Sequence, residues 1–325
     1  MTGLRQPPKK QDRPARVVLR LLILVVLLAL VAFVIWAATT DTLIDATEDV
    51  ALDGLELDTR DTYGTMTLNV VEGEGGPDPV VLLNGYDISG GVVWDGVISA
   101  LPENYETLNI DLPGFGLSDR IPDPGPEHTV ASMAQTVASV IESHYEQPVV
   151  IVGVGLGGEV AAEIAVTNPD VVRGVVLIDV DFWEQGSWLQ IGARLPYFGR
   201  PITYTYWGDG RFGVSEWAPH CEEGGWCPSN DQLARRSLAA SIVSSTDSLR
   251  SFLKTNPASL VPSDLGMIEA PVVYVWSSKG TVPEDSVNMV SDEMTSVFTV
   301  NKVDAWQAHL EKPSSVVDAV LSVSQ

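Results

Sequence analysis

The sequence predicts an α/β fold, in which a mostly parallel β-sheet has helices on both faces and one transmembrane helix precedes it. Two observations lead to this prediction. Short runs rich in valine, isoleucine and leucine alternate with segments of helical spacing over roughly 270 residues, which is typical of a parallel sheet covered on both sides. Before them, residues 21–40 form an uncharged run of 20 residues, long enough to cross about 30 Å of hydrocarbon as a helix.

Charge is distributed very unevenly around that apolar run. Residues 1–20 hold six Lys and Arg against one Asp, whereas the rest of the chain holds 13 basic and 42 acidic side chains, a net charge of −29. The positive-inside tendency therefore places residues 1–20 in the cytoplasm as a basic tail, makes 21–40 a signal-anchor in the lipid bilayer and places the body outside the cytoplasm. A cleaved signal peptide is the alternative; the length of the run and the lack of a small-x-small cleavage site disfavour it. A body this acidic excludes nucleic-acid binding, which needs clustered Lys and Arg.

After the anchor, residues 41–53 are predicted to be a short acidic spacer. Buried strands are predicted at residues 80–83, 107–110, 149–152, 174–178, 271–276 and 297–300. Helices are predicted at residues 130–144, 159–166 and 314–323.

Residues 182–262 interrupt the alternation and hold half of the 24 aromatic side chains. Such a density fits a cap over an apolar pocket, a surface that rests on the membrane, or the core of a small subdomain. Cys221 and Cys227 lie in this stretch and are predicted to form a disulfide, since the body is placed outside the cytoplasm. A metal site formed by His220 and the two cysteines is the alternative, but no fourth ligand is evident. We expect neither a metal nor a cofactor.

Three sequence segments resemble motifs of one known superfamily. The run VVLLNG at 80–85, followed by Tyr86, resembles the strand that ends in His-Gly before an oxyanion-hole residue; DLPGFGLSD at 111–119 resembles the loop D-x-x-G-x-G-x-S; HLEKP at 309–313 resembles the end of the segment that carries the catalytic histidine. From about residue 55 onward the chain resembles the α/β-hydrolase superfamily, in its capped, epoxide-hydrolase and haloperoxidase-like branch. The resemblance implies a core of residues 54–181 and 263–325, a cap or lid at 182–262 and hydrolase chemistry.

The same resemblance shows that the catalytic triad positions are substituted. The nucleophile of the superfamily sits at the centre of G-x-S-x-G on a sharp strand-to-helix turn, and that centre is Gly155 here. The position of the acid is Gly280, and the position of the histidine is Trp306. Because no side chain there can attack, ionise or accept a proton, we expect a pseudoenzyme that binds a ligand or a protein partner.

A binding pocket can survive the loss of catalysis. The resemblance implies an oxyanion-hole-like pocket at Asn84, Gly85, Tyr86 and Leu156, where backbone N–H groups would receive a small apolar ligand with a carbonyl or carboxylate group. The alternative is an active ester-type hydrolase with a displaced site, in which His309 acts as base with a loop serine or a bound water. Asp179 and Asp181 are weaker candidates for the acid of such a site.

A second alternative is dinucleotide binding. Gly153, Gly155 and Gly158 satisfy G-x-G-x-x-G after a strand, and Asp179 follows the next strand, as the fingerprint requires. Such a fingerprint usually opens its domain, whereas several strands precede it here. One substitution in G-x-S-x-G-G also produces the same pattern.

Overall fold

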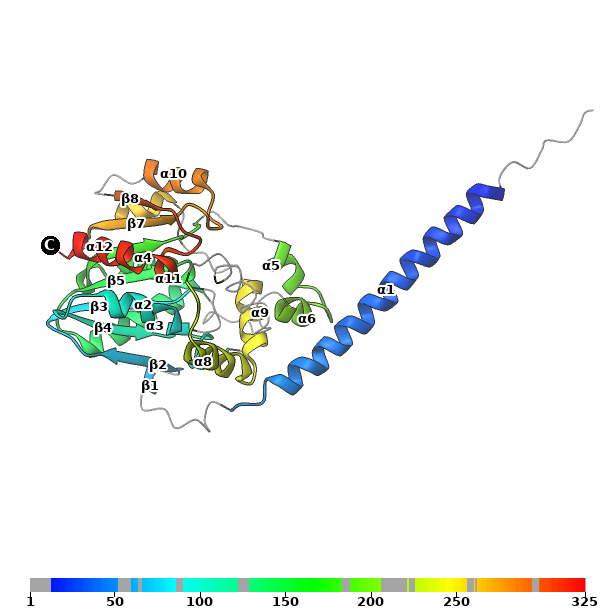
Figure 1. Ribbon diagram of the computed structural model, residues 1–325, viewed down its shortest axis with the longest axis horizontal. Helices are drawn as coiled ribbons and strands as arrows, with labels where there is room; N and C mark the ends of the chain where they lie inside the picture. The colour runs from blue at the N-terminus through cyan, green and yellow to red at the C-terminus, as the bar shows by residue number, and fades with distance from the viewer. Residues whose placement is uncertain are drawn as a thin grey trace, which may run out of the picture.

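The computed structural model describes residues 13–51, 60–63, 66–85, 90–121, 129–182, 188–205, 221, 226–255, 260, 262–293 and 298–324. Its centre is an eight-stranded sheet with the order β1-β2-β4-β3-β5-β6-β7-β8 (Figure 1). The six strands from β3 to β8 run parallel; at one edge β2 runs antiparallel to β4, and β1 runs antiparallel to β2. The strands are β1 Arg60–Tyr63, β2 Met66–Gly73, β3 Asp78–Leu83, β4 Tyr105–Ile110, β5 Val149–Val154, β6 Val172–Ile178, β7 Val272–Ser277 and β8 Phe298–Val303.

The six predicted strands are confirmed as β3 to β8, and the three predicted helices as α3, α4 and α12. The α-helices of the body are α2 Asp95–Ala100, α3 Val130–His144, α4 Leu156–Thr167, α5 Trp188–Ala193, α6 Gly199–Thr203, α8 Asn230–Ser241, α9 Ser245–Thr255, α10 Glu284–Glu293, α11 Ala308–Glu311 and α12 Pro313–Val323. Short 3-10 helices lie at η2 Gly90–Trp94, η4 Pro169–Val171 and η6 Pro262–Met267.

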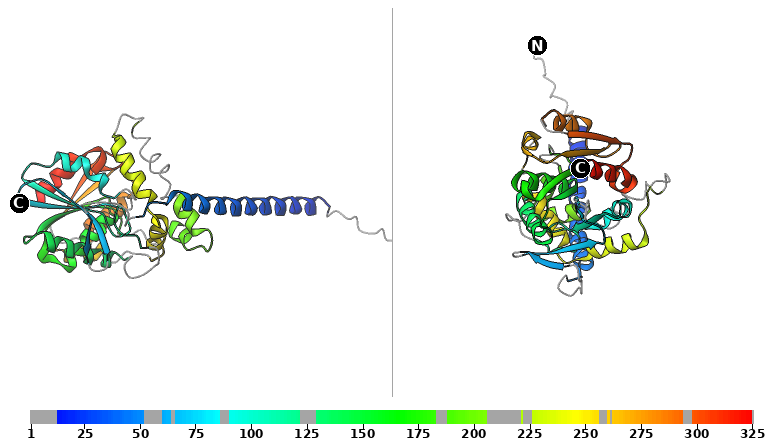
Figure 2. Two further views of the ribbon diagram at one scale, coloured as in Figure 1. Left: turned by 90° about the horizontal axis from the view of Figure 1, so that it is seen from below. Right: turned by 90° about the vertical axis from the view of Figure 1, so that its left-hand side faces the viewer.

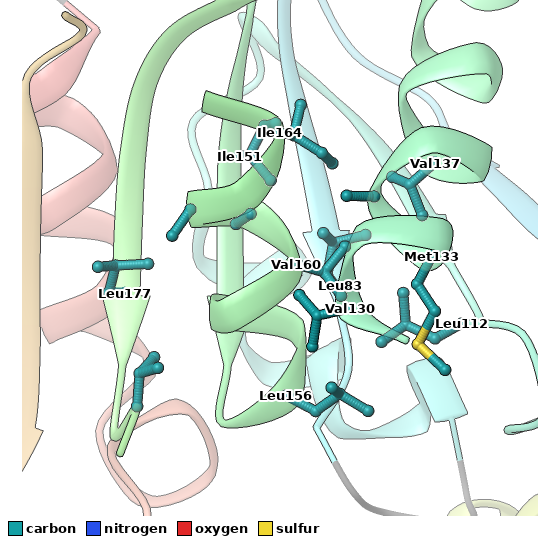
Figure 3. Close-up of a cluster of buried hydrophobic side chains, with 14 of the residues drawn as sticks. Leu83, Leu112, Val130, Met133, Val137, Ile151, Leu156, Val160, Ile164 and Leu177 are labelled. Carbon is teal, nitrogen blue, oxygen red and sulfur yellow. The ribbon is translucent and has the colours of Figure 1, made fainter. Parts of the chain in front are cut away.

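Alternate side chains of each central strand enter two separate apolar cores. Val149 and Ile151 of β5 pack in the core beneath α3 and α4, whereas Val150 and Val152 pack in the core beneath α2, α11 and α12. Figure 3 shows part of the first core, in which Ile151 lies beside Ile164 of α4, and Val137 and Met133 come from α3. Burial on both faces explains why the strands are continuous apolar runs in the sequence.

A single helix, α1 Arg13–Thr47, projects away from the body (Figures 1 and 2). By length and composition, its part from Val17 to Thr47 is a candidate membrane span. Residues 41–47, which the sequence suggests as part of a spacer, continue this helix instead. Ile44 is fully buried and Glu48 nearly so, because this end of α1 packs against the body.

Between β6 and β7 the chain leaves the sheet in an insertion, whose described part contains α5, α6, α8 and α9. In Figure 1, α5, α6 and α9 lie between the sheet and α1, and Figure 2 shows the same arrangement from another side. The disulfide expected in this stretch joins Cys221 to Cys227. The carboxyl ends of the parallel strands thus lie on the side of the sheet that faces the insertion.

Candidate functional site

The turn between β5 and α4 has the sharp geometry of a nucleophile elbow, with glycine at its tip. Gly155 has φ 50° and ψ −116°, and it is the residue immediately before the first turn of α4. Its N–H donates to the carbonyl of Ile178 at 2.9 Å, and its carbonyl accepts from the N–H groups of Gly158 and Glu159. A non-glycine residue in such a conformation costs about 1–3 kcal/mol, which glycine avoids.

The other glycines of the elbow allow close packing of α4 onto the strands. A Cβ atom at Gly153 would lie 2.2 Å from the carbonyl oxygen of Gly157, and one at Gly157 would lie 2.3 Å from the carbonyl oxygen of Leu83. A Cβ atom at Gly158 would lie 2.2 Å from a methyl group of Val180. Close packing within the chain therefore explains glycine at these positions, without a bound nucleotide.

The strand order also differs from the order 3-2-1-4-5-6 of dinucleotide-binding folds, in which the fingerprint follows the first strand. Here the fingerprint follows β5. The strand order therefore does not favour dinucleotide binding.

The positions expected for the acid and the histidine lie next to each other at the ends of β7 and β8. The N–H of Lys279 donates to the carbonyl of Ala305 at 3.0 Å, which joins the two loops. A Cβ atom at Gly280 would lie 3.0 Å from the carbonyl oxygen of Trp306. The side chain of Trp306 is 47% exposed. The loops are thus arranged as neighbours, but neither position offers a carboxylate or an imidazole.

Asp179, at the end of β6, is held by Ser277 of β7. One carboxylate oxygen accepts from the N–H of Ser277 at 2.6 Å, and the other accepts from its hydroxyl at 2.5 Å. The Ser277 hydroxyl oxygen in turn accepts from the N–H of Ala308 at 2.8 Å. The backbone of Asp179 has φ 48°, a left-handed conformation unusual for a non-glycine residue. This network, which links β6, β7 and α11, is not evident from the sequence.

Burial raises the pKa of the Asp179 carboxyl to about 6 from its ordinary value of 3.8, while the hydrogen bonds from Ser277 oppose the rise. The folded protein therefore holds one more proton at this group than the unfolded chain between these two pH values. Stability falls as pH rises wherever the folded state holds more protons. At about pH 6 the folded group is half ionised, and the loss of stability is nearly complete about one pH unit higher.

We expect Asp179→Asn to remove this part of the dependence of protein stability on pH. Between about pH 4 and pH 7, wild type should lose up to about 3 kcal/mol more unfolding free energy than the variant does. Urea unfolding of both proteins at the two pH values measures the difference. Equal changes in the two proteins would show that the pKa of Asp179 is not raised.

His309, the candidate base of a displaced site, lies on α11 and is buried. Its ring lies 5.5 Å from the indole of Trp94, measured between centroids, at an interplanar angle of 48°. Trp94 ends η2 and is fully buried. The histidine therefore sits in the packing between α11 and η2. Asp181, the other weak candidate, is partly buried beyond the end of β6.

The loop after β3, where the sequence predicts an oxyanion-hole-like pocket, is described as far as Gly85. The Asn84 side chain accepts from the N–H of Leu112 at 3.1 Å and donates to the carbonyl of Gly85 at 3.0 Å, so it fixes the loop after β3. A Cβ atom at Gly85 would lie 3.0 Å from the carbonyl oxygen of Val154, so this loop abuts the elbow strand. Leu156 is the first residue of α4, where N–H groups have no partner within the helix. Tyr86 lies outside the described residues.

Among the described residues, no cluster of three or more His, Cys, Asp or Glu side chains could hold a metal ion. The sulfurs of Cys221 and Cys227 are bonded to each other. His220, the third member of the alternative metal site, lies outside the described residues.

The sheet order, the elbow and the loops at its carboxyl edge define the class of α/β hydrolases. The sequence pattern of the alpha/beta hydrolase family matches residues 80–319, and the chain belongs to that family. It is 31% identical over 132 residues to a pimeloyl-[acyl-carrier protein] methyl ester esterase of Aeromonas hydrophila, which covers 40% of this chain and 49% of that protein. The chain thus spans about half the length of the curated relatives it matches.

Two solved structures have the same fold. A hydrolase from Pseudomonas aeruginosa PA01 superposes with a TM-score of 0.65 at 16% identity, over 82% of this chain and 99% of that one. A membrane phospholipase A, described as a bacterial virulence factor, superposes with a TM-score of 0.61 at 18% identity, over 95% of this chain and 97% of that one.

Proposed function

We propose that this protein is a membrane-anchored, catalytically inactive member of the α/β-hydrolase family that binds a ligand at its elbow. Gly155 carries the proposal: it keeps the backbone geometry of the elbow and has no side chain to serve as a nucleophile. Gly280 and Trp306 complete the substitution of the triad. An enzyme accepts elbow strain to present its nucleophile, whereas a protein without that task gains stability from glycine there.

The ligand that suits this site has a carbonyl or carboxylate group on an apolar body. The first turn of α4 directs N–H groups toward the carboxyl edge of the sheet, and the oxyanion loop after β3 abuts it. Asp179 does not act as a base in this proposal, because both of its carboxylate oxygens accept hydrogen bonds from Ser277. The protein therefore holds its ligand without turning it over.

The proposed topology of the chain rests on the apolar helix α1 and on the uneven distribution of charge on either side of it. The helix anchors the chain, residues 1–20 lie in the cytoplasm and the acidic body lies outside it. The core comprises 54–181 and 263–325, and the insertion 182–262 forms a cap over the carboxyl edge. The likeness to a membrane phospholipase A is consistent with a membrane setting for this fold.

Ester hydrolysis tests the proposal. The full chain in detergent, assayed with p-nitrophenyl esters of short and medium acyl chains, should hydrolyse no faster than its Gly155→Ala variant. Both rates should equal the rate of spontaneous hydrolysis in buffer with detergent, since Gly155 offers no nucleophile. The alternative, a displaced site, predicts clear turnover by wild type and its loss in His309→Ala. Turnover that Gly155→Ala leaves intact and His309→Ala abolishes would replace our proposal by that alternative.

A further inference from the structure

We propose that the turn between α5 and α6 enters the membrane beside α1. The proposal rests on the anchoring role of α1 proposed above and assigns the insertion a lipid-binding surface. We call this surface the α5–α6 tip and define it as Ile191, Leu195, Tyr197 and Phe198. Its partner is the hydrocarbon and interfacial region of the bilayer that α1 crosses.

Ionic contacts fix the insertion to the end of α1. The Arg200 guanidinium, on α6, lies 2.8 Å from a carboxylate oxygen of Asp45 and 3.5 Å from one of Asp41, both on α1. It also lies 3.3 Å from Asp247 of α9. One turn further along, Glu48 accepts from the N–H of Thr246 at 2.8 Å. The insertion therefore has a defined position relative to the membrane helix.

An apolar contact extends this attachment toward the membrane. The ring of Phe198 lies 4.7 Å from the ring of Phe33, measured between centroids, and Phe33 stacks on Trp36 at 5.2 Å. Ala37 and Thr40, on the same side of α1, are nearly fully buried. Helix α1 thus meets the insertion along a stripe that begins at Phe33.

The depth of Phe33 decides where the tip lies. If residues 21–40 span the hydrocarbon, Phe33 lies seven residues inside its outer boundary, about 10 Å at 1.5 Å per residue. If the span lies further toward the N-terminus and Trp36 marks the interface, Phe33 still lies about one turn deeper than that interface. In both registers Phe198, which touches Phe33, is at membrane depth.

The side chains around that contact suit lipid. Ile191 is 59% exposed, Leu195 41% and Tyr197 89%. Tyr197 is the most exposed of the four tip residues, and its φ of 64° is a left-handed conformation that is unfavourable for a bulky residue. Aromatic side chains with a polar end are enriched at the membrane interface, and isolated apolar ones beside them gain by burial in it.

Charge favours an apolar contact over an electrostatic one. The body is strongly acidic, which repels anionic headgroups. Arg200, close to the point where α1 leaves the membrane, is surrounded by three carboxylates and is therefore not directed at lipid phosphates. Arg194, an exposed cation between Ile191 and Leu195, donates a hydrogen bond to the carbonyl of Lys254 at 3.2 Å. The α5–α6 tip is thus expected to enter neutral bilayers through its apolar side chains, without requiring anionic lipid.

Quenching by brominated lipid tests the proposal on the full chain in phosphatidylcholine nanodiscs. An environment-sensitive fluorophore is attached to Leu195→Cys at the tip, to Val26→Cys in α1 and to Ser139→Cys on the exposed face of α3; the native cysteines stay in their disulfide. We expect at least a two-fold loss of fluorescence in brominated lipid for the labels at 26 and 195, and none at 139.

The three positions separate the two proposals. Quenching at 26 with none at 195 would overturn the insertion of the tip and leave the anchor standing. Absence of quenching at 26 would overturn the anchor and, with it, the insertion. Quenching at 195 that matches the label at 26 supports both.

Discussion

Combining Gly155→Ser, Gly280→Asp and Trp306→His should raise the rate of ester hydrolysis by this protein above that of wild type. The backbone at Gly155 already has the elbow conformation, so a serine there would be exposed at the start of α4. The loops that carry Gly280 and Trp306 adjoin each other, as a carboxylate and an imidazole of a triad must. A positioned base contributes about 10²–10⁴-fold, and we expect a gain near the low end of that range.

The matched control replaces Gly155 by alanine in the same triple variant. Alanine introduces the same backbone strain, about 1–3 kcal/mol, without a hydroxyl group. Gly280→Asp lowers the stability of both variants further. Its Cβ atom would lie 3.0 Å from two carbonyl oxygens, so the loop must shift. Initial rates with p-nitrophenyl butyrate compare the two proteins. A folded triple variant no faster than the alanine control would contradict the assignment of these positions to the triad.

Asp111→Ala should lower the unfolding free energy by about 3–5 kcal/mol. Asp111 ends β4 and is buried; one carboxylate oxygen accepts from the N–H of Gly91 at 2.5 Å, and the other accepts from the N–H of Leu117 and the amide of Asn69, both at 2.9 Å. Truncation removes a hydrogen bond from two buried donor groups, at Gly91 and Asn69, and from the half-buried N–H of Leu117, and each such loss costs about 1–3 kcal/mol. Arg120 and these bonds stabilise the carboxylate, although burial raises its pKa.

Urea unfolding of the full chain in detergent, monitored by near-ultraviolet circular dichroism, measures the change in unfolding free energy. Asp170→Ala, at an exposed position after α4, is the control and should change stability by less than about 0.5 kcal/mol. Asp111→Asn keeps one acceptor oxygen and should fall between the two. A loss of less than about 1 kcal/mol of unfolding free energy in Asp111→Ala would show that the segments around Gly91, Leu117 and Asn69 do not depend on this carboxylate.

The sequence predicts the elements whose signal is local. Strands β3 to β8 are buried on both faces, so each is a continuous apolar run that can be recognised without its neighbours. Strands β1 and β2 lie at the edge and contain many polar residues, such as RDTY in β1, and they are missed. The helical course of 41–47 is missed because its acidic side chains pair with Arg200, far away in the chain.

The candidate site divides in the same way. The elbow is predictable, because its glycines form a compact motif in which each position has a steric role. The network of Asp179 with Ser277 is not predictable, since the two residues lie 98 positions apart and the sequence does not show that this serine at the end of β7 is buried. His309 illustrates the same limit: the motif predicts its position in the chain, but its packing on Trp94 depends on how α11 meets η2.

The central claim is that the elbow carries no nucleophile, and covalent labelling tests it most directly. The full-length wild-type protein is incubated with a fluorophosphonate probe and analysed by intact-protein mass spectrometry, beside an active serine esterase of this family. We expect complete labelling of the esterase and no adduct on this protein at any serine. A stoichiometric adduct on any serine of wild type would contradict the claim and identify a displaced active site.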